Sequence, residues 1–357
     1  MVSAEVANIT EQEAELYDRQ IRLWGLDAQK RLRSAKICVL GVSGLGAEIT
    51  KNLVLSGINS MDLVDDAKVS DMDATSQFLA PRDQLGQNRA EASLQRLQQL
   101  NPMVSAEKWK PTFDLDFQVK VSADPSETKD KDAEFFKKFD VVVATNCCKE
   151  EILRINAICR AEKVLFYAGD IFGFYGFSFM DLVSHEYVEE VKETKEADDK
   201  DQEPAAKKQK VQDMETKTVK KAMTFVSMAE TLKVDWSSEM YNKRVKRMDP
   251  SFFLLQVLFE FQSEMGRKPS PASKQEDIEK LKKLRDSVLE RMKIPVTKVT
   301  DAMMEVLFGE LSPVCAIVGG VMAQEIIKAI SNKDAPHNNY FFYNPIESCG
   351  VVETIGY

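Results

Sequence analysis

Short apolar runs separated by amphipathic segments fill the first half of the chain and predict alternating strands and helices. The clearest strand candidates are Ile37–Leu40, Met61–Val64, Phe139–Ala144 and Val164–Ala168. Each is apolar along most of its length, as expected of strands that helices cover on both faces of a parallel sheet. The pattern therefore predicts an α/β fold of the Rossmann type, with a doubly wound and mostly parallel sheet.

Ahead of the first strand, Thr10 and Glu13 form a capping box that predicts a helix from Glu11 to about Arg33. Arg19 and Arg22 lie on this helix. Taken by composition alone, both arginines are expected to be solvated, because most charged helix residues are exposed.

A glycine-rich loop follows the first strand and leads into a helix predicted over Ala47–Leu55. Its glycines are Gly41, Gly44 and Gly46. They permit a tight turn and a close approach of backbone, and the free N–H groups at the start of the helix favour a phosphate. This topology is that of a nucleotide-binding βαβ unit.

The spacing of the glycines departs from that of dinucleotide-binding loops. Gly41–Gly46 reads G-x-x-G-x-G instead of G-x-G-x-x-G, so Ser43 stands where the close-approach glycine belongs. Asp65 and Asp66 follow about 20 residues later, where a carboxylate can bind a ribose hydroxyl. A nucleotide loop and a βα turn that binds nothing both remain open interpretations.

The pattern changes after the fourth strand. Aromatic residues alternate around glycines over Phe172–Met180 and predict a hairpin, or a strand that turns antiparallel at the sheet edge. Glu189–Glu203 then carries eight acidic and three basic residues, and Pro204–Lys221 six basic and two acidic. Such a segment buries too little apolar surface to order itself, so we expect a disordered loop at 189–222. Lys207–Lys210 within it is a nuclear-import signal or a plain solvated cluster.

Three helical patterns follow, over Trp236–Met248, Pro250–Met265 and Lys274–Met292, and predict a small helical subdomain inserted at 223–300. The expected organisation is a first part of the α/β fold at 10–188, the charged loop, this insertion, and a C-terminal part of the fold at 301–357.

The C-terminal part opens with a helix that begins at Ser312. Four small or apolar residues share one of its faces: Ala316, Gly320, Ala323 and Ile327. Because small side chains allow two elements to approach closely, we expect this face to pack against the sheet. Short strands over Asn339–Asn344 and Val351–Ile355 close the chain.

Composition argues against nucleic-acid binding, secretion and membrane insertion. The 357 residues include 48 basic and 57 acidic ones, and the net charge of −9 argues against nucleic-acid binding as the main function. The N-terminus lacks the apolar core of a signal peptide, and the longest apolar run, Leu311–Ala323, is too short to span a bilayer. We therefore expect an intracellular protein, in the nucleus and also the cytoplasm, without a membrane partner.

The cysteines and histidines indicate no metal centre. Six cysteines lack C-x-x-C spacing and mostly lie in apolar runs, which is typical of reduced core thiols, and there are only two histidines. Cys147 and Cys148 are candidates for a thioester-forming nucleophile. They follow a buried strand and have no histidine nearby in the sequence, so the residues themselves disfavour that role.

A series of segments, taken in order, resembles the activating enzymes of ubiquitin-like proteins, which have the ThiF-like adenylating fold. The segments are YDRQIRLWG (Tyr17–Gly25), GVSGLGAEITKNLVLSG (Gly41–Gly57), QFL (Gln77–Leu79), GQNRA (Gly86–Ala90), NP (Asn101–Pro102), GDIFGFYG (Gly169–Gly176) and SPVCAIVGGVMAQEIIKAIS (Ser312–Ser331). Within this family the chain is similar to the small subunits of the heterodimers that activate SUMO. Its length and short helical insertion fit the longer NEDD8 counterpart less well.

The departures from the family pattern imply that the nucleotide site of this chain does not catalyse adenylation. Where active members carry an arginine, a lysine and a metal-binding aspartate, this chain has Ser76, Arg89 and Cys147. Adenylation needs cations on the phosphates and an acid for Mg²⁺. The resemblance therefore implies a vestigial nucleotide site, made of the loop glycines with Asp65 and Asp66, while ATP and Mg²⁺ are bound mainly by a larger catalytic partner.

The resemblance implies that Arg19 has a function in the heterodimer and is not simply a solvated surface residue. In the family, the arginine of the Y-D-R-Q-I-R helix reaches across the heterodimer to the partner's ATP, a task suited to a planar, permanently charged guanidinium. The thioester cysteine belongs to the larger partner, and SUMO is engaged through the complex. The competing hypotheses are an NAD(P)-dependent oxidoreductase on the same βαβ unit and a self-sufficient homodimeric adenylating enzyme.

Overall fold

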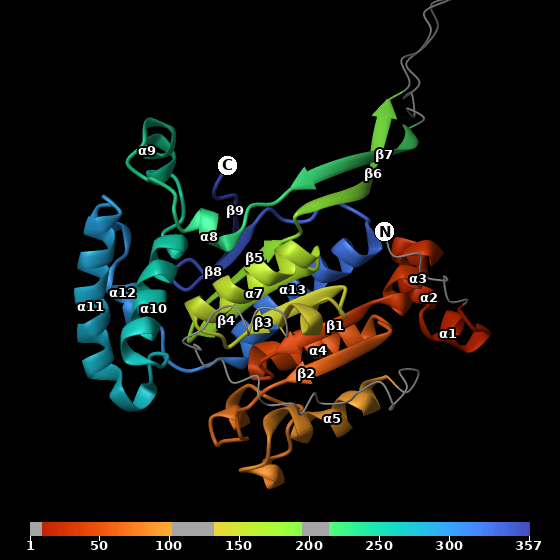
Figure 1. Ribbon diagram of the computed structural model, residues 1–357, viewed down its shortest axis with the longest axis horizontal. Helices are drawn as coiled ribbons and strands as arrows, with labels where there is room; N and C mark the ends of the chain where they lie inside the picture. The colour runs from red at the N-terminus through yellow and green to blue at the C-terminus, as the bar shows by residue number, and fades with distance from the viewer. Residues whose placement is uncertain (1–8, 102–131, 195–213) are drawn as a thin grey trace, which may run out of the picture.

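The computed structural model describes residues 9–101, 132–194 and 214–357 (Figure 1). A seven-stranded sheet with the order β2-β1-β3-β4-β5-β8-β9 forms its centre. The strands are β1 (Lys36–Leu40), β2 (Ser60–Val64), β3 (Val141–Thr145), β4 (Leu165–Phe172), β5 (Tyr175–Asp181), β8 (Tyr340–Asn344) and β9 (Cys349–Glu353). The first four in spatial order are parallel and the remaining pairs are antiparallel. The predicted α/β fold class is confirmed.

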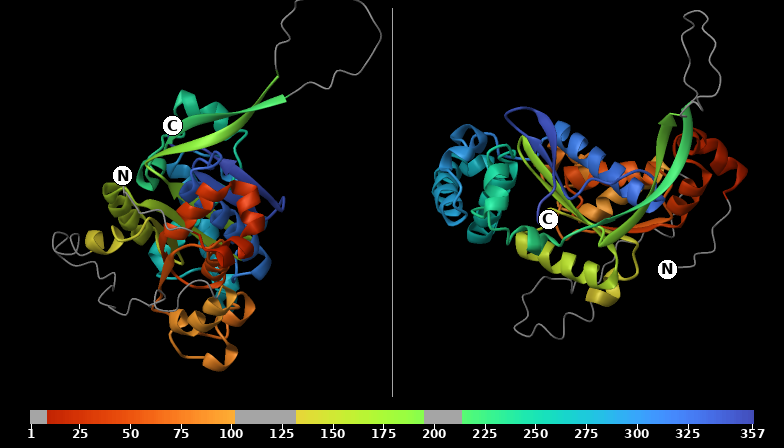
Figure 2. Two further views of the ribbon diagram at one scale, coloured as in Figure 1. Left: turned by 90° about the vertical axis from the view of Figure 1, so that its right-hand side faces the viewer. Right: turned by 90° about the horizontal axis from the view of Figure 1, so that it is seen from above.

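Helices cover both faces of the sheet. The principal helices are α3 (Leu26–Ser34), α4 (Gly44–Leu55), α5 (Arg89–Leu100), α7 (Lys149–Glu162), α10 (Ser251–Met265), α11 (Lys274–Arg291) and α13 (Ser312–Ser331). Alternate residues of β1 point to opposite faces: Ile37 and Val39 join the core under α4 and α13, whereas Cys38 and Leu40 join the core under α7 and α10. The right-hand view of Figure 2 shows α7 and α13 on opposite sides of the sheet.

The N-terminal helix is broken into three pieces, so the prediction of one continuous helix is wrong. These pieces are α1 (Glu11–Leu16), α2 (Asp18–Trp24) and α3, and the predicted capping box at Thr10 is present. The breaks fall at Tyr17 and at Gly25, whose φ is +90°. Tyr17 is 3% exposed, and its hydroxyl accepts a hydrogen bond from Asn101 at 2.8 Å. The chain turns at Tyr17 because that ring is buried beside α4, while α2 remains on the surface.

The predicted aromatic hairpin is confirmed as β4 and β5, whereas the alternative prediction, an antiparallel strand at the sheet edge, is wrong. β5 pairs with β8 on its other side, and β9 forms the edge. β8 and β9 extend the sheet beyond the hairpin, and β8 pairs the backbone edge that β5 would otherwise leave unpaired.

The charged loop is ordered at both ends. β6 (Ser184–Thr194) and β7 (Met214–Thr224) form a two-stranded antiparallel ribbon, so the expectation of disorder over all of 189–222 is wrong there. Backbone pairing between two strands does not require apolar side chains on both faces, which is why composition misses it. Lys207–Lys210 lies outside the described residues.

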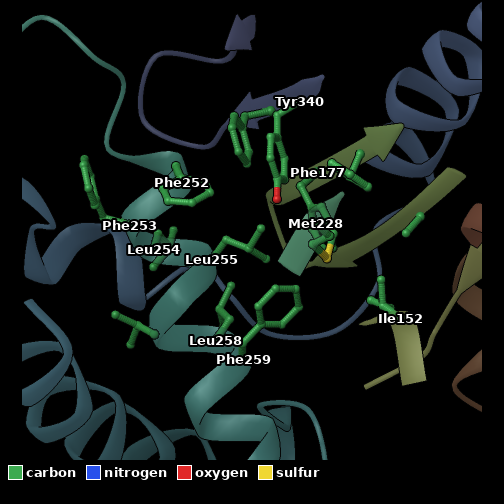
Figure 3. Close-up of a cluster of buried hydrophobic side chains, with 14 of the residues drawn as sticks. Ile152, Phe177, Met228, Phe252, Phe253, Leu254, Leu255, Leu258, Phe259 and Tyr340 are labelled. Carbon is green, nitrogen blue, oxygen red and sulfur yellow. The ribbon is translucent and has the colours of Figure 1, made fainter. Parts of the chain in front are cut away.

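The helical segment after β7 does not form a core of its own. It comprises α8 (Met228–Thr231), α9 (Glu239–Val245), α10, α11 and, further on, α12 (Asp301–Met304). Figure 3 shows the α10 side chains among those of the sheet, where Phe259 meets Phe177 edge to face at 5.9 Å and Phe252 meets Tyr340 at 5.5 Å. α10 therefore forms part of the layer that covers one face of the sheet.

The small-residue face of α13 is packed only in part, which differs from the prediction: Ala323 is 1% exposed within the core and Ile327 is half-buried against it. Val318 and Met322 are fully buried on the packed side, while Ala316 is exposed and a Cβ on Gly320 would meet no atom within 4 Å. The close approach occurs instead at Gly319, where an added Cβ would lie 2.7 Å from the Glu48 Cβ of α4.

The final helix, α13, is longer than the apolar run at Leu311–Ala323. At 20 residues, α13 is long and apolar enough to cross a membrane by length and composition. It is the only such helix within the described ranges, and more than half of its apolar window is buried against α4 and the sheet, as in a core helix. The apolar run over Leu311–Ala323 thus continues into a helix longer than the run itself, and the burial of this helix explains its apolar composition.

Adjacent glycines in α13 offer a matched stability test. Gly320→Ala should stabilise the chain by up to about 1 kcal/mol, because alanine favours the helix and the space is open. Gly319→Ala should be less stable than Gly320→Ala by about 1 to 3 kcal/mol, because its methyl group would press on α4. Urea-unfolding midpoints measure both, and equal midpoints for the two variants would contradict this packing.

Candidate functional site

The carboxyl ends of the parallel strands form the expected site. From β1 the chain passes to β2 on one side and then to β3 on the other, so the strand order reverses between β1 and β3. Ligands of doubly wound sheets bind at such a switch point. The glycine loop, Thr145 at the end of β3 and Asp170 near the end of β4 all lie along this edge. We call this region the strand-end crevice.

The three loop glycines are explained by contacts within the chain. Gly41 has a φ of +80°, and a Cβ there would lie 2.3 Å from the Thr145 carbonyl oxygen. A Cβ on Gly44 would lie 2.5 Å from the Ser76 side chain, and one on Gly46 2.1 Å from the Gly41 carbonyl oxygen. The close approach that these glycines permit is therefore an approach to the protein itself.

A carboxylate occupies the N-terminus of α4. Glu310 Oε1 accepts hydrogen bonds from the Leu45 N–H at 2.9 Å and from the Ser43 hydroxyl at 3.0 Å, and Oε2 accepts from the Gly44 N–H at 3.1 Å. The Ser76 hydroxyl also donates to Oε2, at 3.3 Å. The backbone N–H groups at the start of α4, which were expected to favour a phosphate, thus donate to a carboxylate of the same chain.

Asp65 is likewise engaged within the chain. It accepts hydrogen bonds from the backbone N–H of Val42 at 2.6 Å and of Ala67 at 2.9 Å. Its ion pair with Arg89 has a 2.8 Å contact, and Arg89 also bonds Asp73 at 3.0 Å. The Arg89 side chain is 8% exposed, and the two carboxylates raise its pKa despite burial. Arg89 therefore neutralises its own neighbours and does not extend toward the loop.

The other predicted site residues differ in their surroundings. Asp66 is exposed beside Asp65, and no hydrogen bond or ion pair holds it among the described residues. Burial raises the pKa of Cys147 strongly and that of Cys148 to about 11, so both are thiols at neutral pH. These surroundings disfavour a nucleophilic cysteine. No group of three or more potential metal ligands occurs in the part of the chain that the structure describes.

Two residues of the strand-end crevice were not predicted from the sequence as site residues. Glu310 lies in the loop before α13, 266 positions from Gly44, so no local pattern connects it to the glycine loop. Lys268, in the connection after α10, pairs with Asp170, which is 2% exposed and whose pKa is raised by burial. The second Asp170 carboxylate oxygen, Oδ2, has no hydrogen-bond partner.

Arg19 lies at a distance from the strand-end crevice. It is exposed on α2 and, within the described ranges, makes no ion pair. Its neighbour Gln20 donates to the Leu55 carbonyl oxygen at 3.3 Å, at the C-terminal end of α4. Since α4 has 12 residues, its ends are about 17 Å apart, and the glycine loop is at the other end. The structure thus separates Arg19 from the other candidate site residues.

A surface groove runs between α2, α4 and α13 beside Arg19. Its volume is about 640 Å³, and its lining includes Gln20, Leu23, Trp24, Leu55, Gly320, Ala323 and Ile327. Leu23 is 72% exposed and Leu55 is 42% exposed. Gly320, Ala323 and Ile327 of the small-residue face thus line a groove of mixed polar and apolar character, whose other lining residues include Asn52, Gln324, Lys328 and Asp334. We call it the α2–α13 groove.

Sequence comparison places these features among known proteins. A family model described as the ThiF family matches residues 17–354. The chain is 44% identical over 357 residues to SUMO-activating enzyme subunit 1 of Xenopus laevis, with 100% of this chain and 99% of the relative covered. The human protein of the same name is 42% identical over 359 residues, with 100% and 99% covered.

Solved structures show the same fold at much lower identity. PaaA aligns with a TM-score of 0.55 at 14% identity, covering 99% of this chain and 77% of PaaA. Escherichia coli MccB, solved with MccA-N7isoASN, aligns with a TM-score of 0.54 at 14% identity, covering 99% of this chain and 74% of MccB. These likenesses support the fold.

Proposed function

The chain belongs to the ThiF family, and we propose that it is the non-catalytic subunit of a heterodimeric enzyme that activates SUMO. In this proposal a larger partner binds ATP and Mg²⁺, adenylates the SUMO C-terminus and takes the acyl group onto its own cysteine. The present chain supplies Arg19 in trans and a surface that holds the partner.

The residues of the strand-end crevice do not fit ATP and Mg²⁺. The donors at the start of α4 are bonded to Glu310, and Arg89 is bound by two carboxylates. Ser76 and Cys147 offer neither a cation nor an acid in its charged form for the phosphates and the metal. This misfit is the observation that carries the non-catalytic assignment, and it also disfavours an NAD-dependent oxidoreductase, whose pyrophosphate needs the same donors.

The position of Arg19 supports a role in trans. A guanidinium that is exposed and has no ion pair in the part of the chain that the structure describes is available to phosphate oxygens of another subunit. Its helix contacts the C-terminal end of α4, and the glycine loop of its own chain lies at the other end of that helix, which is about 17 Å long, so Arg19 does not serve that loop. An arginine finger acts on charge that develops in the transition state, so its contribution appears in the adenylation rate.

Arg19→Ala tests this role in the assembled heterodimer. We expect SUMO-dependent ATP–pyrophosphate exchange to fall at least about tenfold, equivalent to about 1.4 kcal/mol of transition-state stabilisation. Arg82→Ala removes another exposed arginine outside α2 and should leave exchange unchanged. Full exchange by the Arg19→Ala heterodimer would eliminate the trans role, provided that size-exclusion chromatography shows an intact complex.

The α2–α13 groove is the surface that we propose for the larger partner. It shares α2 with Arg19, so a protein seated in it would lie next to that guanidinium. Its exposed leucines have a large area to bury on association. A second copy of this chain is the competing occupant, and the oligomeric state of the isolated chain distinguishes the two.

Gly320→Trp tests the groove without disturbing the fold of the isolated chain, because the position faces open space. The indole would fill the groove, and we expect the affinity for the larger subunit to fall at least about tenfold, which is 1.4 kcal/mol. Titration calorimetry measures the affinity, and Glu305→Gln, at an exposed position outside the groove, is the control. Wild-type affinity in the tryptophan variant would place the interface elsewhere.

A further inference from the structure

The geometry points to Glu310 as an internal anion that takes the place of a nucleotide phosphate on the glycine loop and closes this subunit to phosphate ligands. This inference deepens the proposed function and rests on it, since it gives the physical reason why this half of the heterodimer is silent. It concerns binding by the chain itself and so can be tested apart from the partner.

The first step is the convergence of donors on one carboxylate. Two backbone N–H groups in the first turn of α4 and the hydroxyls of Ser43 and Ser76 all donate to Glu310, at 2.9 to 3.3 Å. Ser43 is 4% exposed and Ser76 is 6% exposed, so these are buried donors that need an acceptor. The set resembles a phosphate cradle in composition, and it is already satisfied.

The second step is that the position of Glu310 is fixed. The hairpin turn between β4 and β5 holds the segment before Glu310: Gly173 N–H donates to the Gly309 carbonyl at 2.7 Å, and Phe174 N–H donates to the Val306 carbonyl at 2.9 Å. A Cβ on Gly173 would lie 2.1 Å from the Val306 carbonyl oxygen, so the two backbones are in close contact. α13 begins directly after Glu310 and anchors its other side.

The third step is the pairing of the remaining charges. Lys268 is bound to Asp170, and Arg89 is bound to Asp65 and Asp73. No cation at the strand-end crevice is therefore free, within the described ranges, to attract a phosphate past the charge of Glu310. An incoming phosphate would meet a like charge at the position where it needs donors.

Removal of the carboxylate should convert the cradle into an anion site. In Glu310→Ala the donors lose their acceptor while the positive end of the α4 dipole remains, so an anion from solution gains the vacated position. The ligand class is a phosphate, either inorganic or on a nucleotide. Adenosine, which shares only the base and sugar, should gain nothing.

Calorimetric titration of the full chain with inorganic pyrophosphate at low salt tests the inference. We expect no binding at millimolar pyrophosphate for the wild type or for Glu305→Gln, whose side chain is exposed in the same region. Glu310→Ala should bind pyrophosphate at least about tenfold more tightly than the wild type, and ATP should compete with it while adenosine does not.

Two results would overturn the inference. One is wild-type chain that binds pyrophosphate as tightly as Glu310→Ala. The other is a Glu310→Ala chain, folded by circular dichroism, that binds no better than Glu305→Gln. If the alanine variant does not fold, Glu310→Gln serves instead: its amide oxygen keeps an acceptor without the charge, and pyrophosphate binding must again exceed that of the wild type.

The proposed function fails in a different way from this inference. Unchanged exchange in the Arg19→Ala heterodimer would remove the trans role of Arg19, and exchange by the isolated chain would refute the non-catalytic assignment. Neither result depends on how the Glu310 variants bind pyrophosphate. A wrong role for Glu310 would leave the effect of Arg19 intact and alter only the titrations of the chain alone.

Discussion

The hydrogen bonds from the start of α4 to Glu310 are the interaction on which the arrangement of this molecule depends. Buried N–H groups at a helix start need acceptors, and here the acceptor comes from the segment that leads into α13. The contact joins the N-terminal βαβ unit to the C-terminal helix, which then packs on α4 at Gly319. One carboxylate thus satisfies the donors of the glycine loop and links two distant parts of the chain.

The basic residues of the strand-end crevice are paired within the chain, whereas Arg19 on the surface is not paired within the described residues. Inside the strand-end crevice, Arg89 and Lys268 are each matched by a carboxylate of the chain, so little field remains to attract a ligand. On the surface, Arg19 is exposed on the helix that lines the α2–α13 groove and has no internal counter-charge in the described residues. This contrast is the basis of our proposal that Arg19 acts on a second protein.

The sequence predicted what depends on local periodicity. The parallel strands were recognisable because each is a short, mostly apolar run; β1, β3 and β4 are buried on both faces, whereas β2, at the sheet edge, is fully buried on one. The glycine loop was recognisable because the turn into α4 requires a positive φ at Gly41. Contacts between distant segments were not predictable: nothing near Glu310 indicates that it meets Gly44, 266 positions away. The outward face of α13 was assigned wrongly because small residues favour close approach on either side, and Gly319 rather than Gly320 makes the contact.

The central claim is that this chain has the fold of an adenylating enzyme without adenylating activity of its own. The most direct measurement is ATP–pyrophosphate exchange with SUMO, catalysed by the isolated chain, by the isolated larger subunit and by the two combined. The account predicts no exchange above background for the isolated chain and full exchange for the combination. Acyl-adenylate formed by the isolated chain would contradict it.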